Sequence, residues 1–136
     1  MSKNDNPHQV LAHAAMAAMP KAYAPYSRFQ VGAAILDEHG HIHTGVNVEN
    51  AAYPQGACAE AGAIAAMVMA GGRQIKAIAV SGRGDSLCTP CGGCRQRIRE
   101  FATATTPVVI CGEDSIKAEF TLGDLLPHNF GPDNLT

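Results

Sequence analysis

Three cysteines and one glutamate have the spacing of a zinc site that keeps one coordination position open. Cys58 stands two residues before Glu60, and Cys91 and Cys94 follow later in the chain as a Cys-x-x-Cys pair. Three thiolates can bind one Zn²⁺ and leave its fourth position for water, as in catalytic rather than structural zinc sites. A carboxylate so close to the first ligand can move protons at that water. The pattern therefore predicts metal-assisted hydrolysis.

Both cysteine groups fall where a helix is predicted to begin, over residues 58–70 and from Cys91 or Gly92 to about residue 101. Helix N-termini carry partial positive charge, so we expect them to lower the pKa values of these thiols. Two such helix starts, facing each other at the ends of neighbouring strands, would bring the three sulfurs together. A zinc complex with three thiolates has a net charge of −1, which makes its water harder to ionise, and a nearby base such as Glu60 is then needed.

Other interpretations of the cysteines remain open. The Cys-x-x-Cys pair alone could be a redox pair or half of a structural zinc site. A redox pair does not explain Cys58 or Glu60. A structural site needs a fourth ligand, and Cys88 is available. We favour the open site, because a closed one leaves Glu60 without a role, and we interpret Cys88 and Cys111 as spare thiols.

Hydrophobic periodicity and turn residues predict helices packed on a mixed sheet, an α/β fold. A helix rich in alanine starts at Pro7 and should end or kink near Met19, because Pro20 follows. The turn at His39-Gly40 should join two strands as a hairpin. Strands are predicted at 30–36, 41–48, 75–80, 107–110 and 116–120, and a short helix at 122–126. The length suits one domain over residues 1–136.

The histidines offer a second candidate metal site. His41 and His43 share one face of a predicted strand, but such a pair is more often a solvated strand edge, which we favour here. We interpret His8, His13 and His39 as surface residues.

Composition excludes several partners. The net charge is −2 with histidine neutral, and there is no basic block of the kind that nucleic-acid-binding proteins carry. No apolar run is long enough to span a membrane. The first six residues lack the charged-then-apolar order of a signal peptide. We therefore expect a cytoplasmic location, where thiols stay reduced and the five cysteines serve as metal ligands and spares.

Five segments, in order and spread over nearly the whole chain, resemble the small zinc-dependent cytidine deaminases. They are 22–34 (AYAPYSRFQVGAA), 47–53 (NVENAAY), 58–60 (CAE), 90–96 (PCGGCRQ) and 125–132 (LLPHNFGP). The resemblance implies hydrolysis of cytidine and 2′-deoxycytidine to the uridines and ammonia, as in pyrimidine salvage. It also implies a three-layer α/β/α fold with a five-stranded mixed sheet, and a homotetramer.

Carried over by position, the resemblance makes Cys58, Cys91 and Cys94 the Zn²⁺ ligands and Glu60 the catalytic proton carrier. The substrate-binding residues that it implies are Phe29, Asn47, Glu49, Tyr53, Ala59 and Phe130.

Each substrate-binding residue has an implied role. Asn47 and Glu49 would bind the ribose hydroxyls, Phe29 would pack on the pyrimidine, and the main chain at Ala59 would read the base edge. Phe130 would reach a neighbouring subunit's pocket. From residue type alone, Asn47 and Glu49 would more often stabilise a turn at a strand end, and Phe29 and Tyr53 would more often be core residues.

Three rival functions remain. One is deamination of another aminopyrimidine nucleoside, as in the related blasticidin-S deaminases; the stretch through Asn47 and Glu49, with Phe29, favours cytidine. A second is a polynucleotide-editing deaminase, which the lack of a basic stripe argues against. A third is a catalytically silent zinc-binding or interaction protein, which the intact Glu60 argues against.

One position departs from the family's pattern. Many relatives carry arginine directly after Cys-Ala-Glu, where this chain has Ala61, whereas Arg97 stands where most relatives have a small apolar residue. Arg97 follows Cys94 by three residues, so on a helix both lie on one face. We hypothesise that Arg97 supplies the missing charge by hydrogen-bonding the Cys58 or Cys94 sulfur. The alternative is a solvated arginine on a surface helix.

Overall fold

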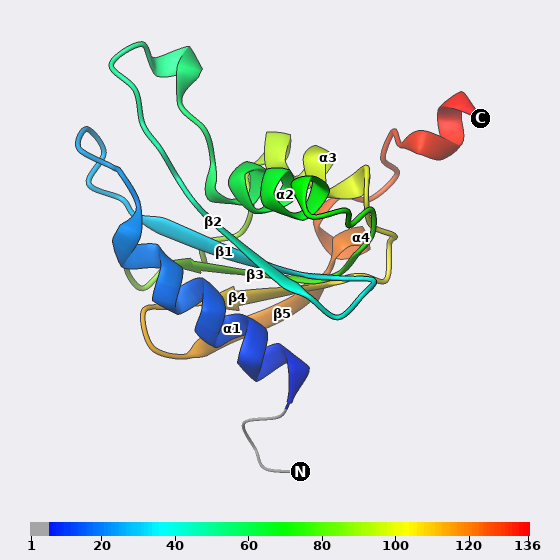
Figure 1. Cartoon of the computed structure of the whole chain (residues 1–136), viewed down its shortest axis with the longest axis horizontal. Coiled ribbons are helices and arrows are strands. Elements are labelled where there is room, and N and C mark those ends of the chain that lie inside the picture. Colours follow the sequence, from blue (N-terminus) through cyan, green and yellow to red (C-terminus); the bar gives the residue numbers. More distant parts are fainter. Residues whose placement is uncertain (1–5) are drawn as a thin grey trace.

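The computed structural model describes residues 6–136, so all of the segment considered for a signal peptide except Asn6 lies outside it. Its helices and strands follow one another in the order that the sequence predicts (Figure 1). The helices are α1 (Pro7–Ala18), α2 (Ala59–Met69), α3 (Gly92–Arg99) and α4 (Leu122–Leu125), with 3₁₀ turns η2 (Met19–Lys21), η3 (Tyr53–Gln55) and η4 (Pro132–Leu135). The strands are β1 (Val31–Asp37), β2 (Ile42–Val46), β3 (Ile75–Gly82), β4 (Pro107–Cys111) and β5 (Ile116–Thr121).

The five strands form one mixed sheet in the order β2-β1-β3-β4-β5. β3 and β4 are parallel, and the other neighbouring pairs are antiparallel. Helix α1 covers one face of the sheet, and α2, α3 and α4 lie over the other (Figure 1). The predicted three-layer α/β/α fold is thus confirmed. The two metal-site helices follow β2 and β3, which flank β1, so the expectation that they follow neighbouring strands is wrong.

Alternating side chains of the central strands divide the core into two layers. On the α1 side they are small, Ala34, Ala77 and Ala79, and they pack against Leu11 and Ala15. On the other side they are larger, and they pack against α2 and α3. This second layer contains Ile35, Ile78, Val80, Val108 and Ile110 from the strands with Ala63, Met67 and Ile98 from the helices. The helices thereby fit closely on both faces.

Local signals account for the ends of the elements. Asn6 caps α1 by accepting a hydrogen bond from the backbone N–H of His8 (2.9 Å), and Pro20 ends the regular helix just after Ala18 as predicted. Thr121 and Asp124 form a capping box at α4. β3 runs to Gly82, beyond the predicted end at residue 80. In residues 6–136 no helix is long and apolar enough to cross a membrane.

The β1–β2 hairpin is closed by a hydrogen bond between two largely buried side chains, His43 and Asp37, rather than ending in a solvated edge. The Nε2 atom of His43 lies 2.7 Å from Asp37 Oδ2, and Asp37 Oδ1 accepts hydrogen bonds from the backbone N–H groups of His39 and His41. Asp37 is 2% exposed. The expectation that His43 is solvated is therefore wrong; the sequence pattern alone could not reveal that the carboxylate at the end of β1 faces it. His41 is exposed, as expected.

Helix α2 lies directly on β2 at Gly45. A Cβ atom at this position would overlap the backbone N of Ala63 and the backbone O of Ala59. Only a residue without a side chain lets the first turns of α2 approach the strand this closely. Since Cys58 caps this helix, the contact also sets where the first predicted metal ligand lies.

We predict that Gly45→Ala destabilises the protein by about 1–3 kcal/mol or more, because backbone atoms rather than a flexible side chain must move. Urea unfolding followed by circular dichroism measures this. Gly112→Ala is the matched control, since its Cβ would meet the flexible end of Lys117. Equal stability of the two variants would show that the close approach at Gly45 is not a constraint.

The Asp37 carboxylate should stabilise the hairpin in a pH-dependent way. Burial alone would raise its pKa, but hydrogen bonds from His43 and from the backbone of His41 and His39 outweigh burial and lower the pKa to about 2 from an ordinary 3.8. The stabilisation is therefore complete above about pH 4 and is lost as the pH falls toward 2. We predict that Asp37→Asn lowers the Tm at pH 7, and that the gap to wild type narrows between pH 4 and pH 2. A gap independent of pH would contradict this.

Candidate active site

The structure brings the three predicted metal-binding cysteines together. The sulfur atoms of Cys58, Cys91 and Cys94 all lie within 4.8 Å of one another. Cys58 is the N-cap residue of α2, Cys91 is the N-cap residue of α3, and Cys94 lies in the first turn of α3. Among residues 6–136, this is the one group of three or more histidine, cysteine or acidic side chains with metal-binding spacing. Cys88 is not part of it, so a closed four-cysteine site is not formed.

The two helix starts meet because the loops before them are fixed. Val48 forms isolated bridges to Tyr23 on one side and to Ala57 on the other, which holds both ends of the long β2–α2 loop. The backbone O of Pro90 accepts a hydrogen bond from Arg95 Nε at 2.6 Å, which ties the residue before Cys91 to α3. The cysteines are therefore positioned by backbone and side-chain contacts outside the cluster.

The donor set fits Zn²⁺. Zinc–thiolate bonds of about 2.3 Å in a tetrahedral arrangement place sulfurs about 3.8 Å apart, within the spread seen here. Three sulfur donors close together suit a soft-to-borderline ion, and three protein ligands leave one position of a tetrahedral zinc open. The cluster therefore has the composition of a zinc site able to bind a further small ligand.

Burial dominates the electrostatics of this region. Burial raises the pKa values of the Cys58 and Cys94 thiols. The pKa of Cys91 is lowered, chiefly by the backbone N–H of Cys94. The expectation that helix starts lower all three thiol pKa values thus holds for Cys91 alone. Burial also raises the pKa of Glu60, whose residue is 4% exposed. A cation bound between the sulfurs would offset the cost of keeping thiolates there.

A pocket of about 210 Å³ opens onto the cysteines and Glu60. It is lined by Phe29, Val31, Asn47, Cys58, Ala59, Glu60, Cys88, Thr89 and Cys91. Four residues predicted from three separate segments, Phe29, Asn47, Ala59 and Glu60, therefore line one cavity with two of the predicted metal-binding cysteines. Phe29 is 41% exposed, so its interpretation as a core residue is wrong.

The side chains of Asn47 and Glu49 hydrogen-bond to the backbone of residues 26–31, which leads into β1. The Asn47 side chain accepts from Val31 N (2.9 Å) and donates to Phe29 O (2.8 Å). The Glu49 carboxylate accepts from the backbone N–H of Tyr26 (3.0 Å) and Ser27 (3.1 Å) and from the Ser27 hydroxyl. These contacts match the turn-stabilising alternative, and they leave part of each side chain's hydrogen-bonding capacity free.

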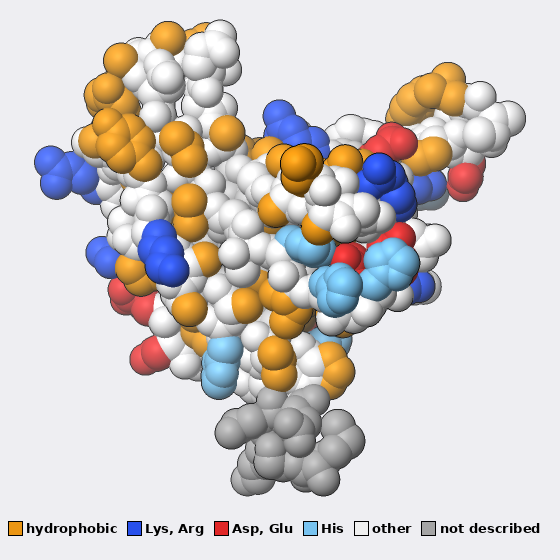
Figure 2. Space-filling model, viewed as in Figure 1, with side chains coloured by type: hydrophobic (Ala, Val, Ile, Leu, Met, Phe, Trp, Pro, Cys, Tyr) orange, Lys and Arg blue, Asp and Glu red, His pale blue; other side chains and the backbone are white. Residues whose placement is uncertain are grey.

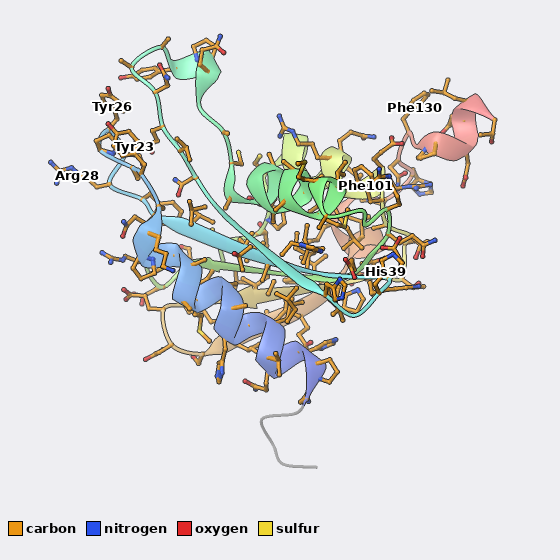
Figure 3. All side chains as sticks on the ribbon, in the orientation of Figure 1. Tyr23, Tyr26, Arg28, His39, Phe101 and Phe130 are labelled. Atoms are coloured by element: carbon orange, nitrogen blue, oxygen red, sulfur yellow. The ribbon has the colours of Figure 1, made fainter. Side chains whose placement is uncertain are left out.

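Three predicted site residues lie away from the cysteine pocket. Glu49 and Tyr53 line a separate hollow with Tyr26, and the rings of Tyr26 and Tyr53 meet edge to face with centroids 6.2 Å apart. Tyr53 is 77% exposed, so it is not a core residue either. Phe130 is 59% exposed on the C-terminal arm, well away from Tyr26 (Figure 3).

Sequence reasoning missed several lining residues. Cys88 and Thr89 precede the Pro-Cys motif and face the pocket, and burial raises the pKa of Cys88 to about 11. Their position directly before Pro90 and Cys91 in the sequence could have indicated that they lie near the metal site. Val31 was predicted within a strand, and its place at the pocket edge depends on where β1 begins. No signal in the sequence pairs Ser27 with Glu49.

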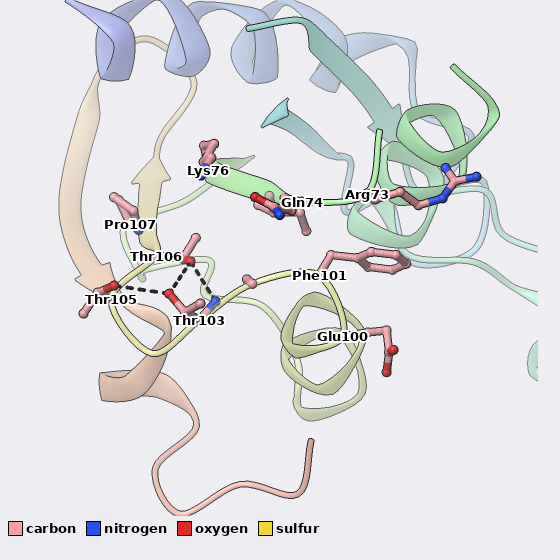
Figure 4. A pocket seen from close by; sticks show the side chains of 11 residues that line it. Arg73, Gln74, Lys76, Glu100, Phe101, Thr103, Thr105, Thr106 and Pro107 are labelled. Carbon is pink, nitrogen blue, oxygen red and sulfur yellow. Dashed lines mark hydrogen bonds between the residues drawn. The ribbon is translucent and has the colours of Figure 1, made fainter. Parts of the chain in front are cut away.

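A hollow larger than the cysteine pocket lies elsewhere on the protein. It measures about 520 Å³ and lies where β3 and β4 begin, lined by charged and hydroxyl side chains such as Lys76, Glu100 and Thr106 (Figure 4). Thr103 and Thr106 are hydrogen-bonded to each other there (Figure 4). No cluster of metal-binding side chains is found in it among residues 6–136. Chemistry rather than size therefore places the candidate site at the smaller pocket.

A three-layer α/β/α protein with three thiols at two helix starts and a buried carboxylate beside them falls in the class of zinc-binding hydrolases. Residues 5–111 match the family model described as "Cytidine and deoxycytidylate deaminase zinc-binding region". The chain belongs to the cytidine deaminase family.

Curated and solved relatives agree over most of the chain. A cytidine deaminase of Sporosarcina psychrophila is 42% identical over 119 residues, 88% of each chain. The crystal structure of cytidine deaminase from Burkholderia pseudomallei superposes with a TM-score of 0.83 at 43% identity, covering 90% of this chain and 98% of that one. The crystal structure of cytidine deaminase from Mycobacterium tuberculosis superposes with a TM-score of 0.79 at 39% identity, covering 90% of this chain and 95% of that one. The resemblance, the fold and the zinc-binding cluster predicted from sequence are confirmed.

Proposed function

We propose that this protein hydrolyses cytidine and 2′-deoxycytidine to uridine and 2′-deoxyuridine, with release of ammonia. The observation that carries the proposal is one pocket that Glu60 lines together with Cys58 and Cys91, whose thiols cluster with the thiol of the buried Cys94. The relatives at about 40% identity that bear the name cytidine deaminase support the choice of substrate.

Cys58, Cys91 and Cys94 would hold the Zn²⁺. When bound, zinc supplies a Lewis acid that makes a water molecule more acidic and more nucleophilic. The remaining chemistry is the transfer of protons, for which the chain provides Glu60. Its carboxyl group is buried, and burial raises its pKa above the ordinary value of a glutamate. A carboxyl group placed beside the reacting atoms can accept a proton in its ionised form and donate it again once protonated.

Glu60 carries protons in both halves of the reaction. It accepts one proton from the water as the oxygen forms a bond to C4 of the pyrimidine, and it delivers that proton to N3. It then moves the second proton of that water from the new hydroxyl group to the amino nitrogen. The C4–N bond breaks and ammonia leaves, so that one water is consumed for each amino group released.

Residues in the cysteine pocket and in the hollow beside Tyr26 would hold the nucleoside in position relative to Glu60. Phe29 would pack on the pyrimidine ring, and the main chain at Ala59 would read the base edge. Asn47 and Glu49 would bind the ribose hydroxyls with the hydrogen-bonding capacity that their contacts to the 26–29 turn leave free. Because the same two side chains fix that turn, sugar binding and the placement of Phe29 would be linked.

We further propose that residues 1–136 form one domain, and that the protein is a cytoplasmic homotetramer. Large apolar side chains are exposed on two projecting segments, the β2–α2 loop and the C-terminal arm (Figure 2). They include Tyr53 at 77%, Phe130 at 59% and Leu135 at 80% exposure. Apolar surface of this kind marks interfaces, and Tyr53 and Phe130 would complete pockets between subunits.

We predict that Glu60→Gln retains zinc and the fold but lowers kcat on cytidine by at least about 10²–10⁴-fold, because the amide cannot carry protons. The fall in cytidine absorbance measures turnover, and elemental analysis measures zinc. Glu113→Gln, which alters a surface pair with Arg83, is the control. Near-normal turnover of the Glu60→Gln protein would refute the mechanism.

We predict that Phe130→Ala raises KM for cytidine and weakens assembly. In this chain the ring contacts solvent, while its backbone O accepts a hydrogen bond from Gln96 Nε2 at 2.8 Å that holds the arm against α3. Kinetics and analytical ultracentrifugation on the same samples test both effects. Leu135→Ala, further along the arm, separates the ring's role from general loss of apolar surface. Unchanged kinetics would remove Phe130 from the site.

A further inference from the structure

Arginine 97 contacts a sulfur of the metal cluster. Its Nη1 atom donates to Cys94 Sγ across 3.5 Å, and Cys94 is fully buried. The two residues are three positions apart on α3, which places them on one helix face. Arg97 as a whole is exposed, and its hydrogen bond to the buried sulfur is made through Nη1.

The other two arginines of α3 serve different parts of the structure. Arg95 donates to the backbone O of Pro90 and of Leu125, and Arg99 donates to Asn129 Oδ1 and the backbone O of Ala102. Neither contacts a cysteine sulfur. Arg97 is exposed, as expected of a surface arginine, but its hydrogen bond to Cys94 distinguishes it from Arg95 and Arg99.

The start of α3 leaves room for this contact. A Cβ atom at Gly93 would lie 3.3 Å from Arg97 Nη1, tighter than an ordinary contact. The guanidinium thus lies over the glycine one turn before it. Because Gly93 precedes Cys94 directly, the lack of a side chain there lets the cation approach the sulfur from the solvent side.

The charge of the site calls for such a contact. Zinc with three thiolates keeps a net charge of −1, and Glu60 stands beside it in a buried pocket. A donor to a thiolate both offsets this charge and orients the ligand. We infer that Arg97 is a positioning residue that stabilises the zinc-loaded site through the Cys94 sulfur. It does not touch the reacting atoms. The inference rests on the proposed zinc occupancy.

The test compares zinc-loaded proteins that carry Arg97→Gln, Arg97→Lys or the remote surface change Arg83→Gln. Zinc release into excess chromogenic chelator gives a rate. We expect release about tenfold faster from Arg97→Gln, at the low end of such effects because the guanidinium is largely solvated. The release rate of Arg97→Lys should lie between those of wild type and Arg97→Gln, since lysine keeps the positive charge but lacks the planar guanidinium group with its several N–H donors. Arg83→Gln should match wild type.

A spectroscopic signature separates this role from general destabilisation. With Co²⁺ in place of zinc, the sulfur-to-metal charge-transfer band should move to longer wavelength in Arg97→Gln, because the Cys94 thiolate loses a hydrogen-bond donor. A second-site change tests the charge itself. Ala61 follows Cys58 by three residues on α2, the same spacing as Arg97 after Cys94, so Ala61→Arg should restore part of the lost zinc retention.

The outcomes distinguish the inference from the proposed function. Wild-type protein that binds zinc and deaminates cytidine, with an Arg97→Gln protein unchanged in release rate and in the cobalt band, would overturn the inference alone. Equal effects of Arg97→Gln and Arg83→Gln would do the same. Wild-type protein that holds no zinc would overturn both.

Discussion

The structure depends on the contact of two helix starts over one face of the sheet. Cys58 caps α2 and Cys91 caps α3, so the sulfurs meet only if both helices lie close to the strands beneath them. Gly45 permits this for α2 by leaving no side chain between helix and strand. Burial raises the thiol pKa values of Cys58 and Cys94, which makes an assembled cluster costly without a cation. Fold and metal binding are therefore coupled.

The same arrangement explains why Glu60 is suited to proton transfer. The first turn of α2 carries it into a pocket where it is 4% exposed, and burial raises its pKa. The backbone that supplies Phe29 to this pocket is held by the side chains of Asn47 and Glu49 from the segment after β2. The pocket thus draws residues from separate segments, Phe29 from before β1, Asn47 from after β2, and Ala59 and Glu60 from α2.

Much of this could be predicted from sequence, because the strongest signals are local. Proline and glycine indicated most element ends, the Cys-x-x-Cys spacing indicated the cluster of three thiols, and the predicted segments were found within a few residues. What failed was non-local. β1 lies between β2 and β3, so the two metal-site helices do not follow neighbouring strands as predicted. His43, predicted to be solvated, instead hydrogen-bonds Asp37 within the hairpin. Two further features also could not be predicted from sequence: the hydrogen bonds of Glu49 to the turn at Ser27, and the position of Cys88 in the pocket wall. Both depend on which residues the tertiary structure brings together, and residue type alone does not show this.

We propose that deamination of cytidine by this protein requires zinc held by the three cysteines. The most direct measurement follows zinc content and cytidine turnover in one sample while a strong chelator removes the metal and added Zn²⁺ restores it. We expect a single zinc per chain, turnover that falls in proportion to the zinc removed, and recovery of turnover when zinc returns. Full turnover by zinc-free protein, or zinc-loaded protein that leaves cytidine unchanged, would contradict this role of zinc.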